Sequence, residues 1–200
     1  MGRPKQGAAS PRERVLATAS ELFYRRGFSA VGVDEIVSQS GVAKMTLYRH
    51  FPSKDELIAA YLERADEAFS MWFESALARA TDPRAQLLAV FEALAELATS
   101  SMCLGCTFQG SAAEFPDARH PAHRIALAHK VRVRQRLSDL ATQASLRHPD
   151  VLAGQLLRLM DGAWVAARMF GPDNPGVYVA DAAEALIAAH ANDARARLLH

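Results

Sequence analysis

Residues 33–57 read VDEIVSQSGVAKMTLYRHFPSKDEL, and this stretch decides the fold of the chain. Apolar residues recur at helical spacing in its first part, at Val33, Ile36 and Val37. Gly41 follows where a turn between two short helices needs a left-handed backbone, which glycine adopts without strain. A second short helix is predicted from Lys44 to Phe51, and Pro52 ends it because proline cannot continue a helix. The stretch therefore predicts a helix-turn-helix.

The predicted second helix has two chemically different faces. Leu47 and Phe51 lie four residues apart and point inward. The outer side chains are cationic, aromatic or hydroxylated, with one methionine: Lys44, Met45, Thr46, Tyr48, Arg49 and His50. Cations and hydroxyls hold DNA phosphates, and forked or small donors read base edges. The outer face therefore favours a DNA groove, with a simply solvated charged face as the alternative.

A capping box follows the stop proline. In Ser53-Lys54-Asp55-Glu56, the Ser53 hydroxyl is expected to bond the amide of Glu56 while the Glu56 side chain reaches back. The turn glycine, the cationic helix, the proline and this capped helix together resemble the DNA-binding domain of the tetracycline-repressor (TetR) family of bacterial regulators. The resemblance implies an all-α chain of about nine helices, in which a three-helix N-terminal helix-turn-helix domain is joined by a long helix to a C-terminal helical domain for ligand binding and dimerisation.

The same resemblance implies a function and assigns residues to it. The chain is expected to be a repressor, not an enzyme, that binds double-stranded operator DNA as a homodimer and releases it when an unknown small molecule binds; no cofactor is implied. Base reading falls to Lys44 and Arg49, and Lys54 is a phosphate ligand. Further base or phosphate contacts are assigned to Met45, Thr46, Tyr48 and His50. Gly32 and Ala43 stand where hydroxyl caps are usual, and alanine at such a cap costs about 1 kcal/mol.

The basic charge is concentrated at one end of the chain. Residues 1–54 hold nine Lys and Arg against four Asp and Glu, a net +5, whereas the rest holds fourteen against eighteen, a net −4. This asymmetry is expected if a small N-terminal domain meets phosphate and a larger domain does not. No apolar run approaches the ~18 residues that cross a bilayer, and no hydrophobic signal core follows the N-terminal charges, so we expect a cytoplasmic bacterial protein without a membrane partner.

Three segments are predicted along the chain. Residues 1–9 form a flexible basic arm, whose Arg3 and Lys5 either enter a minor groove or remain an idle tail. Residues 10–52 form the DNA-binding domain. Residues 53–200 form the ligand-binding and dimerisation domain, and a helix of about 27 residues, ~40 Å long, leads into it.

Apolar residues of the C-terminal region carry two further predictions. By the family resemblance, the effector pocket is lined by Trp72, Phe73, Phe91, Met102, Phe108, Met160 and Trp164, although ordinary core is the stronger interpretation of each residue taken singly. The last two long helices have rows of Ala and Gly that permit close approach, and they are predicted to form a four-helix interface across a two-fold axis. Its residues are Leu152, Leu156, Leu159, Ala163, Ala167, Ala182, Ala183, Leu186 and Ile187. The same stripes could be internal core.

Two cysteines and two histidines, which are residue types that bind metals, suggest an alternative kind of regulator. Cys103-x-x-Cys106 is followed by His120-x-x-His123, and thiolates with imidazoles in that number could hold zinc. A redox-responsive cysteine pair and inert packing thiols are the other readings, so no metal is assigned. A metal- or redox-responsive regulator is therefore the alternative function within the same class.

Motifs of enzymes are missing from the sequence. There is no phosphate-binding glycine loop, no nucleophile elbow and no H-E-x-x-H. The alternative from another class is a helical interaction or sensor module without operator-specific DNA binding.

Overall fold

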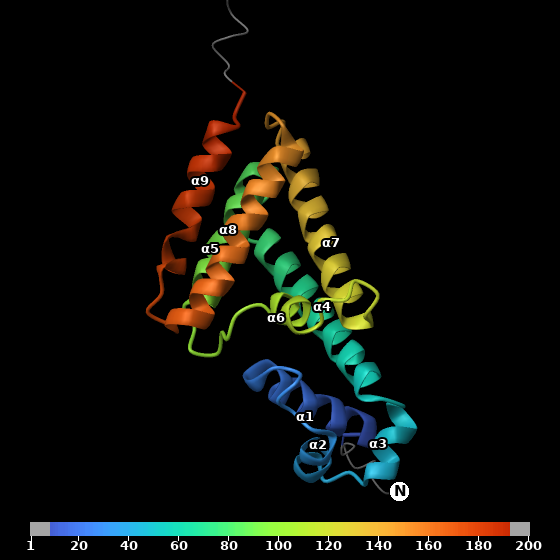
Figure 1. Cartoon of the computed structure of the whole chain (residues 1–200). Helices are drawn as coiled ribbons and strands as arrows, with labels where there is room; N and C mark the ends of the chain where they lie inside the picture. Colours follow the sequence, from blue (N-terminus) through green and yellow to red (C-terminus); the bar gives the residue numbers. More distant parts are fainter. Residues whose placement is uncertain (1–8, 193–200) are drawn as a thin grey trace, which may run out of the picture. The chain divides into compact units, whose positions relative to one another are not determined.

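The computed structural model describes residues 9–192, and these residues form α-helices, one short 3-10 helix and no strand. The predicted all-α fold is therefore confirmed. Arg3 and Lys5, assigned to the basic arm, lie outside the described residues. The elements are α1 (Pro11–Arg26), α2 (Val33–Ser40), α3 (Lys44–His50), α4 (Lys54–Leu77), α5 (Pro83–Ala98), α6 (Thr107–Glu114), α7 (Pro121–Gln143), α8 (Pro149–Phe170), η1 (Pro175–Tyr178) and α9 (Val179–Ala189) (Figure 1).

Packing divides the chain into two units. Unit 1 comprises Met1–Asp66 and Thr107–Leu127, and unit 2 comprises Glu67–Cys106 and Ala128–His200. The chain passes between the units within α4, before α6 and within α7. The domain boundary predicted after residue 52 falls inside unit 1, because the first part of α4 and the segment 107–127 pack with the N-terminal helices.

Unit 1 is built on the amphipathic helix α1. The Ser10 hydroxyl caps it by accepting the N–H of Glu13 at 3.2 Å, and Pro11 occupies the first turn, where a missing N–H costs nothing. The Phe23 ring lies 5.4 Å from that of Phe28 and 5.8 Å from that of Tyr61 in α4. Figure 1 shows α1 lying against α2 and α3. The aromatic cluster therefore positions α1, against which the helix-turn-helix packs.

Helix α4 is shorter than the predicted helix of about 27 residues. It spans 24 residues and ends at Leu77. The chain turns there because Asp82 caps the next helix, its carboxylate accepting the N–H groups of Arg84 and Ala85 at 3.1 Å each. Gln86 fastens the connection by donating to the carbonyl of Leu77 at 3.4 Å.

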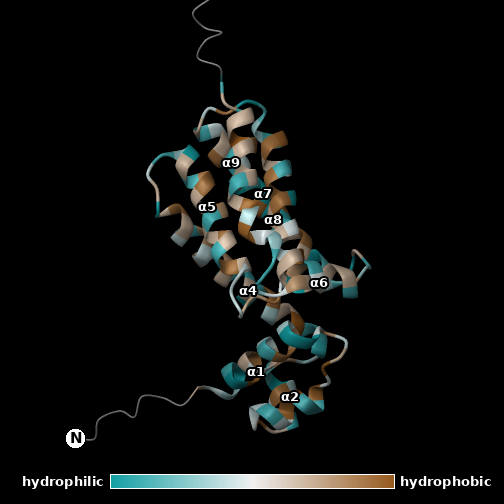
Figure 2. Cartoon of the chain, turned by 90° about the vertical axis from the view of Figure 1, so that its left-hand side faces the viewer, coloured by the Kyte–Doolittle hydropathy of each residue, from teal (hydrophilic) through white to brown (hydrophobic). Residues whose placement is uncertain are grey.

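Helices α5, α8 and α9 supply much of the core of unit 2, and hydrophobic and hydrophilic residues alternate along each of them in Figure 2. The largest fully buried side chains of this unit include Phe73, Leu87, Phe91, Leu94, Leu137 and Leu152. One buried polar residue, Asn174, donates to the carbonyl of Ala98 at 2.9 Å and accepts the N–H of Gly176 at 2.7 Å. The segment before α9 is thereby fixed to the end of α5.

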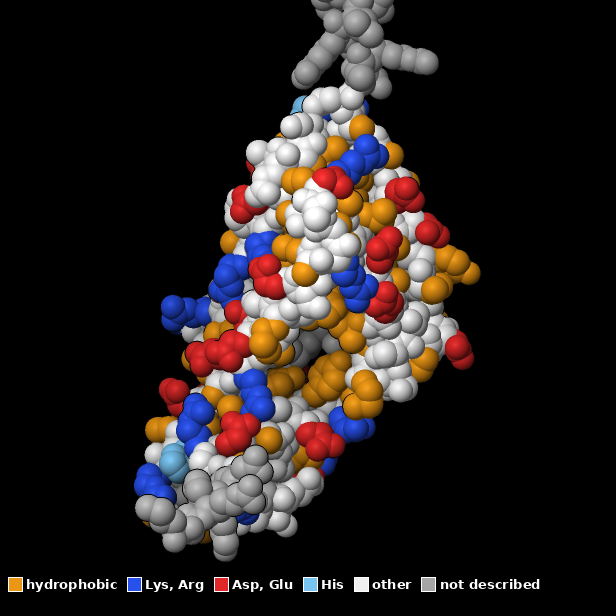
Figure 3. Space-filling view, turned by 180° about the vertical axis from the view of Figure 1, so that it is seen from behind, with side chains coloured by type: hydrophobic (Ala, Val, Ile, Leu, Met, Phe, Trp, Pro, Cys, Tyr) orange, Lys and Arg blue, Asp and Glu red, His pale blue; other side chains and the backbone are white. Residues whose placement is uncertain are grey.

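Charged side chains of both signs are mixed on one face of the molecule. On the face shown in Figure 3, Lys and Arg side chains are interspersed with Asp and Glu, and hydrophobic side chains reach the surface between them. Among residues 9–192, no helix is both long enough and apolar enough to cross a membrane. Because the charges are mixed on this face, a DNA-binding surface is identified from individual side chains.

Candidate nucleic-acid interface

The turn between α2 and α3 has the geometry predicted from Gly41. Gly41 adopts φ 62° and ψ 28°, the left-handed conformation, and donates its N–H to the carbonyl of Val37 at 3.1 Å. Arg14 of α1 braces the turn from the other side, since its Nη2 donates to the carbonyls of Ser40 at 2.6 Å and Gly41 at 2.9 Å. The left-handed conformation favours glycine at residue 41, and a Cβ there would lie 2.9 Å from this Arg14 nitrogen, which would have to shift.

Helix α3 is held by its inner face, as predicted. Leu47 is 1% exposed and Phe51, at the end of the helix, is 2% exposed. The guanidinium of Arg12 lies 5.1 Å from the centre of the Phe51 ring, in cation–π geometry. The predicted DNA-contacting side chains lie on the other faces: Lys44, Met45, Tyr48 and Arg49 are exposed, and Thr46 and His50 are half-buried. Met45 is 82% exposed.

The start of α3 has a poor cap and an exposed ion pair beside it. Ala43 forms no side-chain cap, as the sequence predicted. Lys44 Nζ lies 2.6 Å from Asp34 Oδ1 in the first turn of α2. The pKa of Lys44 is raised above its ordinary value, first by the hydrogen bond to Asp34 and then by the charge of that carboxylate. Lys44 is therefore cationic, and its ammonium is already paired with a carboxylate of α2.

The guanidinium N–H groups of Arg49 have no acceptor in the described structure, whereas the Lys44 ammonium is paired with Asp34. Within residues 9–192 its guanidinium forms no ion pair and no hydrogen bond. A planar fork of N–H donors in this state matches the O6 and N7 acceptors of guanine. Arg49 is thus the better placed of the two predicted base readers.

Lys54 is the first residue of α4, where the serine half of the predicted capping box is formed. The Ser53 hydroxyl accepts the N–H of Glu56 at 3.1 Å. Lys54 is half-buried, and its charge acts on the carboxylate of Glu114 in α6. Lys54 therefore lies at a capped helix start, with a carboxylate near enough to interact with its charge.

Glu114 fastens α6 to the loop between α1 and α2. One carboxylate oxygen accepts the N–H of Phe28 at 3.0 Å, and the other accepts the N–H of Ser29 at 2.7 Å. Partial burial acts to raise the pKa of Glu114, but the hydrogen bonds from Phe28 and Ser29, aided by the charge of Lys54, outweigh it and leave the pKa below its ordinary value. Glu114 is therefore an anion in the folded protein at neutral pH.

The histidines and cysteines of the zinc hypothesis have other surroundings. His120 stacks on Phe115 with ring centres 4.2 Å apart, and His123 Nδ1 lies 2.8 Å from the Phe115 carbonyl oxygen. Cys103 is buried in the core of unit 2, and Cys106 is half-buried. Across residues 9–192, no three His, Cys, Asp or Glu side chains gather to hold a metal ion, so the metal-responsive alternative gains no support.

Five of the seven residues predicted for an effector pocket share the core cluster of unit 2, and Met102 and Phe108 do not. Phe73, Phe91 and Met160 are at most 1% exposed in the core of unit 2, Met102 is 71% exposed, and Phe108 belongs to unit 1. Trp72 and Trp164 do meet, with ring centres 6.2 Å apart.

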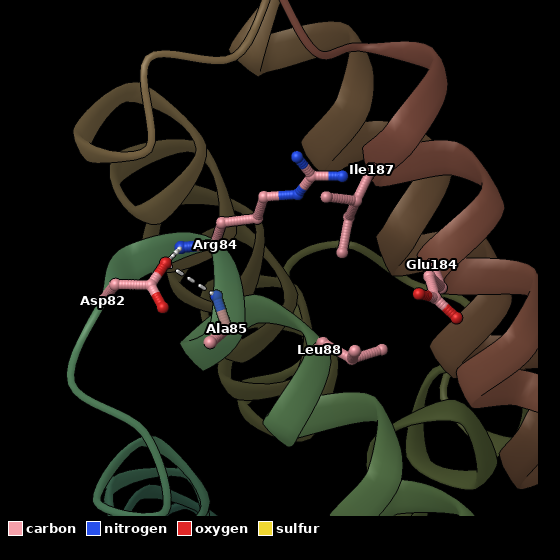
Figure 4. A pocket seen from close by; sticks show the side chains of 6 residues that line it. All are labelled: Asp82, Arg84, Ala85, Leu88, Glu184 and Ile187. Atoms are coloured by element: carbon pink, nitrogen blue, oxygen red, sulfur yellow. Dashed lines mark hydrogen bonds between the residues drawn. The ribbon is translucent and has the colours of Figure 1, made fainter.

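A groove of about 320 Å³ between α5 and α9 is lined by other side chains (Figure 4). Arg84 and Glu184 stand at its rim and Leu88 and Ile187 supply its apolar wall. The Asp82 carboxylate is already committed to the cap of α5.

The predicted dimer residues need a correction. Six of them are 4% exposed or less and pack inside unit 2 of their own chain: Leu152, Leu156, Ala163, Ala167, Ala183 and Ile187. Leu159, Ala182 and Leu186 are half-buried, and Leu159 and Ala182 line a groove beside α8. Helix α8 carries two apolar stripes, and most of its residues assigned to a partner belong to the core stripe. The other stripe exposes Val151, Val165 and Met169, beside a groove of about 410 Å³ between α8 and η1.

Comparison with known proteins agrees with this geometry. The profile described as "Bacterial regulatory proteins, tetR family" matches residues 15–61. SCO4454, a TetR-family transcriptional regulator from Streptomyces coelicolor, superposes with a TM-score of 0.86 at 32% identity, over 91% of this chain and 96% of that chain.

Two curated relatives differ in how much of the chain they match. The HTH-type transcriptional activator FasR of Mycolicibacterium smegmatis is 41% identical over 96 residues, which are 46% of this chain and 44% of FasR. The HTH-type transcriptional repressor KstR2 of the same organism is 26% identical over 172 residues, 84% of this chain and 82% of KstR2.

The turn, the exposed face of α3 and these likenesses define a DNA-binding transcriptional regulator of the helix-turn-helix class. The chain belongs to the TetR family. It is a regulator and not an enzyme, and this decides against the interaction-module alternative.

Several residues that shape the site had no signal in the sequence. Arg14 braces Gly41 across 27 positions, and Glu114 reaches Phe28 across 86. Asp34 is an ordinary first-turn acid until the fold brings Lys44 beside it. No periodicity or local motif encodes such distant contacts.

Proposed function

We propose that this chain is a repressor that binds an operator as a homodimer through α3 and releases it when a small molecule binds unit 2. The observation that supports DNA reading is the outer face of α3, where Met45 and Arg49 are exposed on a helix anchored by Leu47. The N-terminal residues of a recognition helix contact base edges in the major groove. Thr46, Tyr48 and His50 add base or phosphate contacts, and Lys54 adds a phosphate contact.

Repression is proposed because KstR2, named a repressor, matches most of the chain, whereas FasR, named an activator, matches less than half of it. Activation remains the competing outcome. A reporter fused to the promoter beside the gene decides between them. Deleting the gene should raise reporter output, and a fall would establish activation.

Dimerisation is proposed because one helix-turn-helix makes few base contacts, and two-fold pairs bind two half-sites about 34–36 Å apart. The exposed stripe of α8 and the groove beside η1 are the proposed contact surface, lined in part by Arg158, Gly162 and Tyr178. Selection of duplexes from a random library by the wild-type protein tests operator recognition. Palindromic half-sites one helical turn or so apart are expected, and selected sites without two-fold symmetry would contradict the proposal.

The effector is proposed to act by differential affinity, because a ligand shifts an equilibrium only when it prefers one state. A coupling of about 1–3 kcal/mol would weaken operator binding about 5- to 150-fold. Both tryptophans of the chain, Trp72 and Trp164, lie in unit 2, so their fluorescence reports on the proposed effector unit. Compounds that change this emission should also weaken operator binding, and compounds that bind without doing so would contradict the proposal.

A further inference from the structure

The segment 107–127 is inserted between two stretches of unit 2 yet folds with unit 1. The chain leaves unit 2 after Cys106 and re-enters it at Ala128. The segment is closed on itself, because the buried Ser111 hydroxyl donates to the carbonyl of Ala122 at 3.2 Å and His123 bonds the carbonyl of Phe115. Any displacement of unit 2 relative to unit 1 must therefore pass through the ends of this closed segment or through α4.

Glu114 holds this segment to the α1–α2 loop with both carboxylate oxygens. The two donors are the backbone N–H groups of Phe28 and Ser29, which come directly after the end of α1. The adjacent Phe115 ring lies 5.6 Å from the Phe28 ring, so an apolar contact lies beside the polar one. A carboxylate that accepts backbone N–H groups makes charge-assisted bonds, which are roughly twice as strong as neutral ones.

The loop is shaped to receive the carboxylate. Gly27 has φ +83°, and a Cβ built there would lie 2.6 Å from Glu114 Oε1. Glycine at this position therefore ends α1 and also leaves the space that Glu114 occupies. The opposite end of the loop continues directly into α2, and Arg26 bonds Glu35 in that helix.

We propose that Glu114 is the positioning residue that couples the segment 107–127 to the DNA-reading helices α2 and α3. A shift of α6 must either carry the α1–α2 loop with it or break both bonds. This inference rests on the proposed function, because it names the contact through which a change in unit 2 reaches α3. It assigns to one carboxylate a role that no local motif indicates.

The first experiment tests the contact without DNA. In the wild-type protein, the amide resonances of Phe28 and Ser29 should titrate together on acidification, with a midpoint below the ordinary glutamate pKa. Because the folded pKa is lowered, the bond contributes stability that is present above the unfolded pKa and is lost as pH falls through the folded pKa. In Glu114→Gln this joint titration should disappear, whereas Asp117→Asn, whose carboxylate bonds Arg119, should leave it intact. Amides that do not titrate in the wild type would overturn the inference.

The second experiment tests coupling, using the duplex selected by the wild-type protein. Binding of that duplex should slow hydrogen exchange in α3 and also in residues 107–115. In Glu114→Ala the slowing at α3 should persist and the slowing at 107–115 should be lost, with Glu114→Gln intermediate and Asp117→Asn like the wild type.

Glu114→Gln, which keeps one acceptor oxygen, provides the answer should the alanine variant unfold. If duplex binding slows hydrogen exchange in residues 107–115 as much in the folded Glu114 variants as in the wild type, the proposed coupling is wrong. A wild-type protein that selects no duplex would instead overturn the proposed function. The titration of the Phe28 and Ser29 amides would then still test whether Glu114 makes its two hydrogen bonds.

Discussion

Helices α3 and α8 each expose a methionine, but the surroundings of the two side chains differ. Met45 is 82% exposed between Lys44 and Thr46, whereas Met169 is 70% exposed on a stripe shared with Val165. A single exposed apolar side chain is ordinary on a protein surface, so the residues around it must indicate whether it has a partner and of which kind. Cations and hydroxyls around Met45 fit a duplex. Apolar residues beside a groove around Met169 fit a second copy of the chain.

The largest effect is expected on α8. Val165→Asp should place a charge in the proposed two-fold interface, give monomers in sedimentation, and lower operator affinity by about 10²–10⁴-fold, because the second half-site contact is no longer intramolecular. The control is Val131→Asp on α7, since Val131 is 53% exposed and Val165 is 45% exposed. Dimers that survive Val165→Asp would show that this stripe is not the interface.

The next effect is expected on α3. Arg49→Ala should remove about 1–3 kcal/mol of discrimination between the selected duplex and a scrambled one, a factor of about 5–150. Competition binding with both duplexes measures it. Arg25→Ala removes an equally cationic side chain, one that pairs with Glu21 at 3.4 Å, and should leave the ratio unchanged. An unchanged ratio in Arg49→Ala would remove Arg49 from the reading face.

These two helices also show where sequence reasoning succeeds. The turn at Gly41, the inward side chain of Leu47 and the cap at Ser53 were all predicted correctly, because each depends on residues within one or two turns. On α8 the same reasoning took Leu152 and Leu156 for interface. Core and interface stripes have the same helical period, so periodicity identifies an apolar face without identifying what covers it.

Contacts between distant residues mark the other limit of prediction. Glu114 in the sequence is one acid at the end of a short helix, and only the fold brings it to the N–H groups of Phe28 and Ser29. Gly27 directly follows Arg25 and Arg26, the local pattern of an ordinary helix terminator. Its second role, leaving room for the carboxylate, depends on a residue 87 positions away.

A smaller effect is expected at the edge of the reading face. Lys54→Ala should weaken all duplexes alike, because a phosphate contact carries no sequence information. The slope of log K against log salt should fall by about 0.9, which is roughly eightfold in affinity at 0.1 M salt. Titrations of selected and scrambled duplexes at several salt concentrations measure the slope. A loss confined to the selected duplex would make Lys54 a base reader instead.

The smallest effect separates the two methionines most directly. If Met45 packs against a thymine methyl in the major groove, replacing thymine by uracil in the selected half-site removes one buried methyl, about 0.8 kcal/mol or fourfold in affinity. Met45→Ala should bind the thymine duplex about as weakly as the wild type binds the uracil duplex, and should no longer distinguish the two. Met169→Ala should retain the distinction, because its apolar surface is assigned to a protein partner. Equal sensitivity to uracil in the wild type and Met45→Ala would mean that the exposed methionine of α3 contacts no thymine, and the contrast between the two helices would then rest on their charged residues alone.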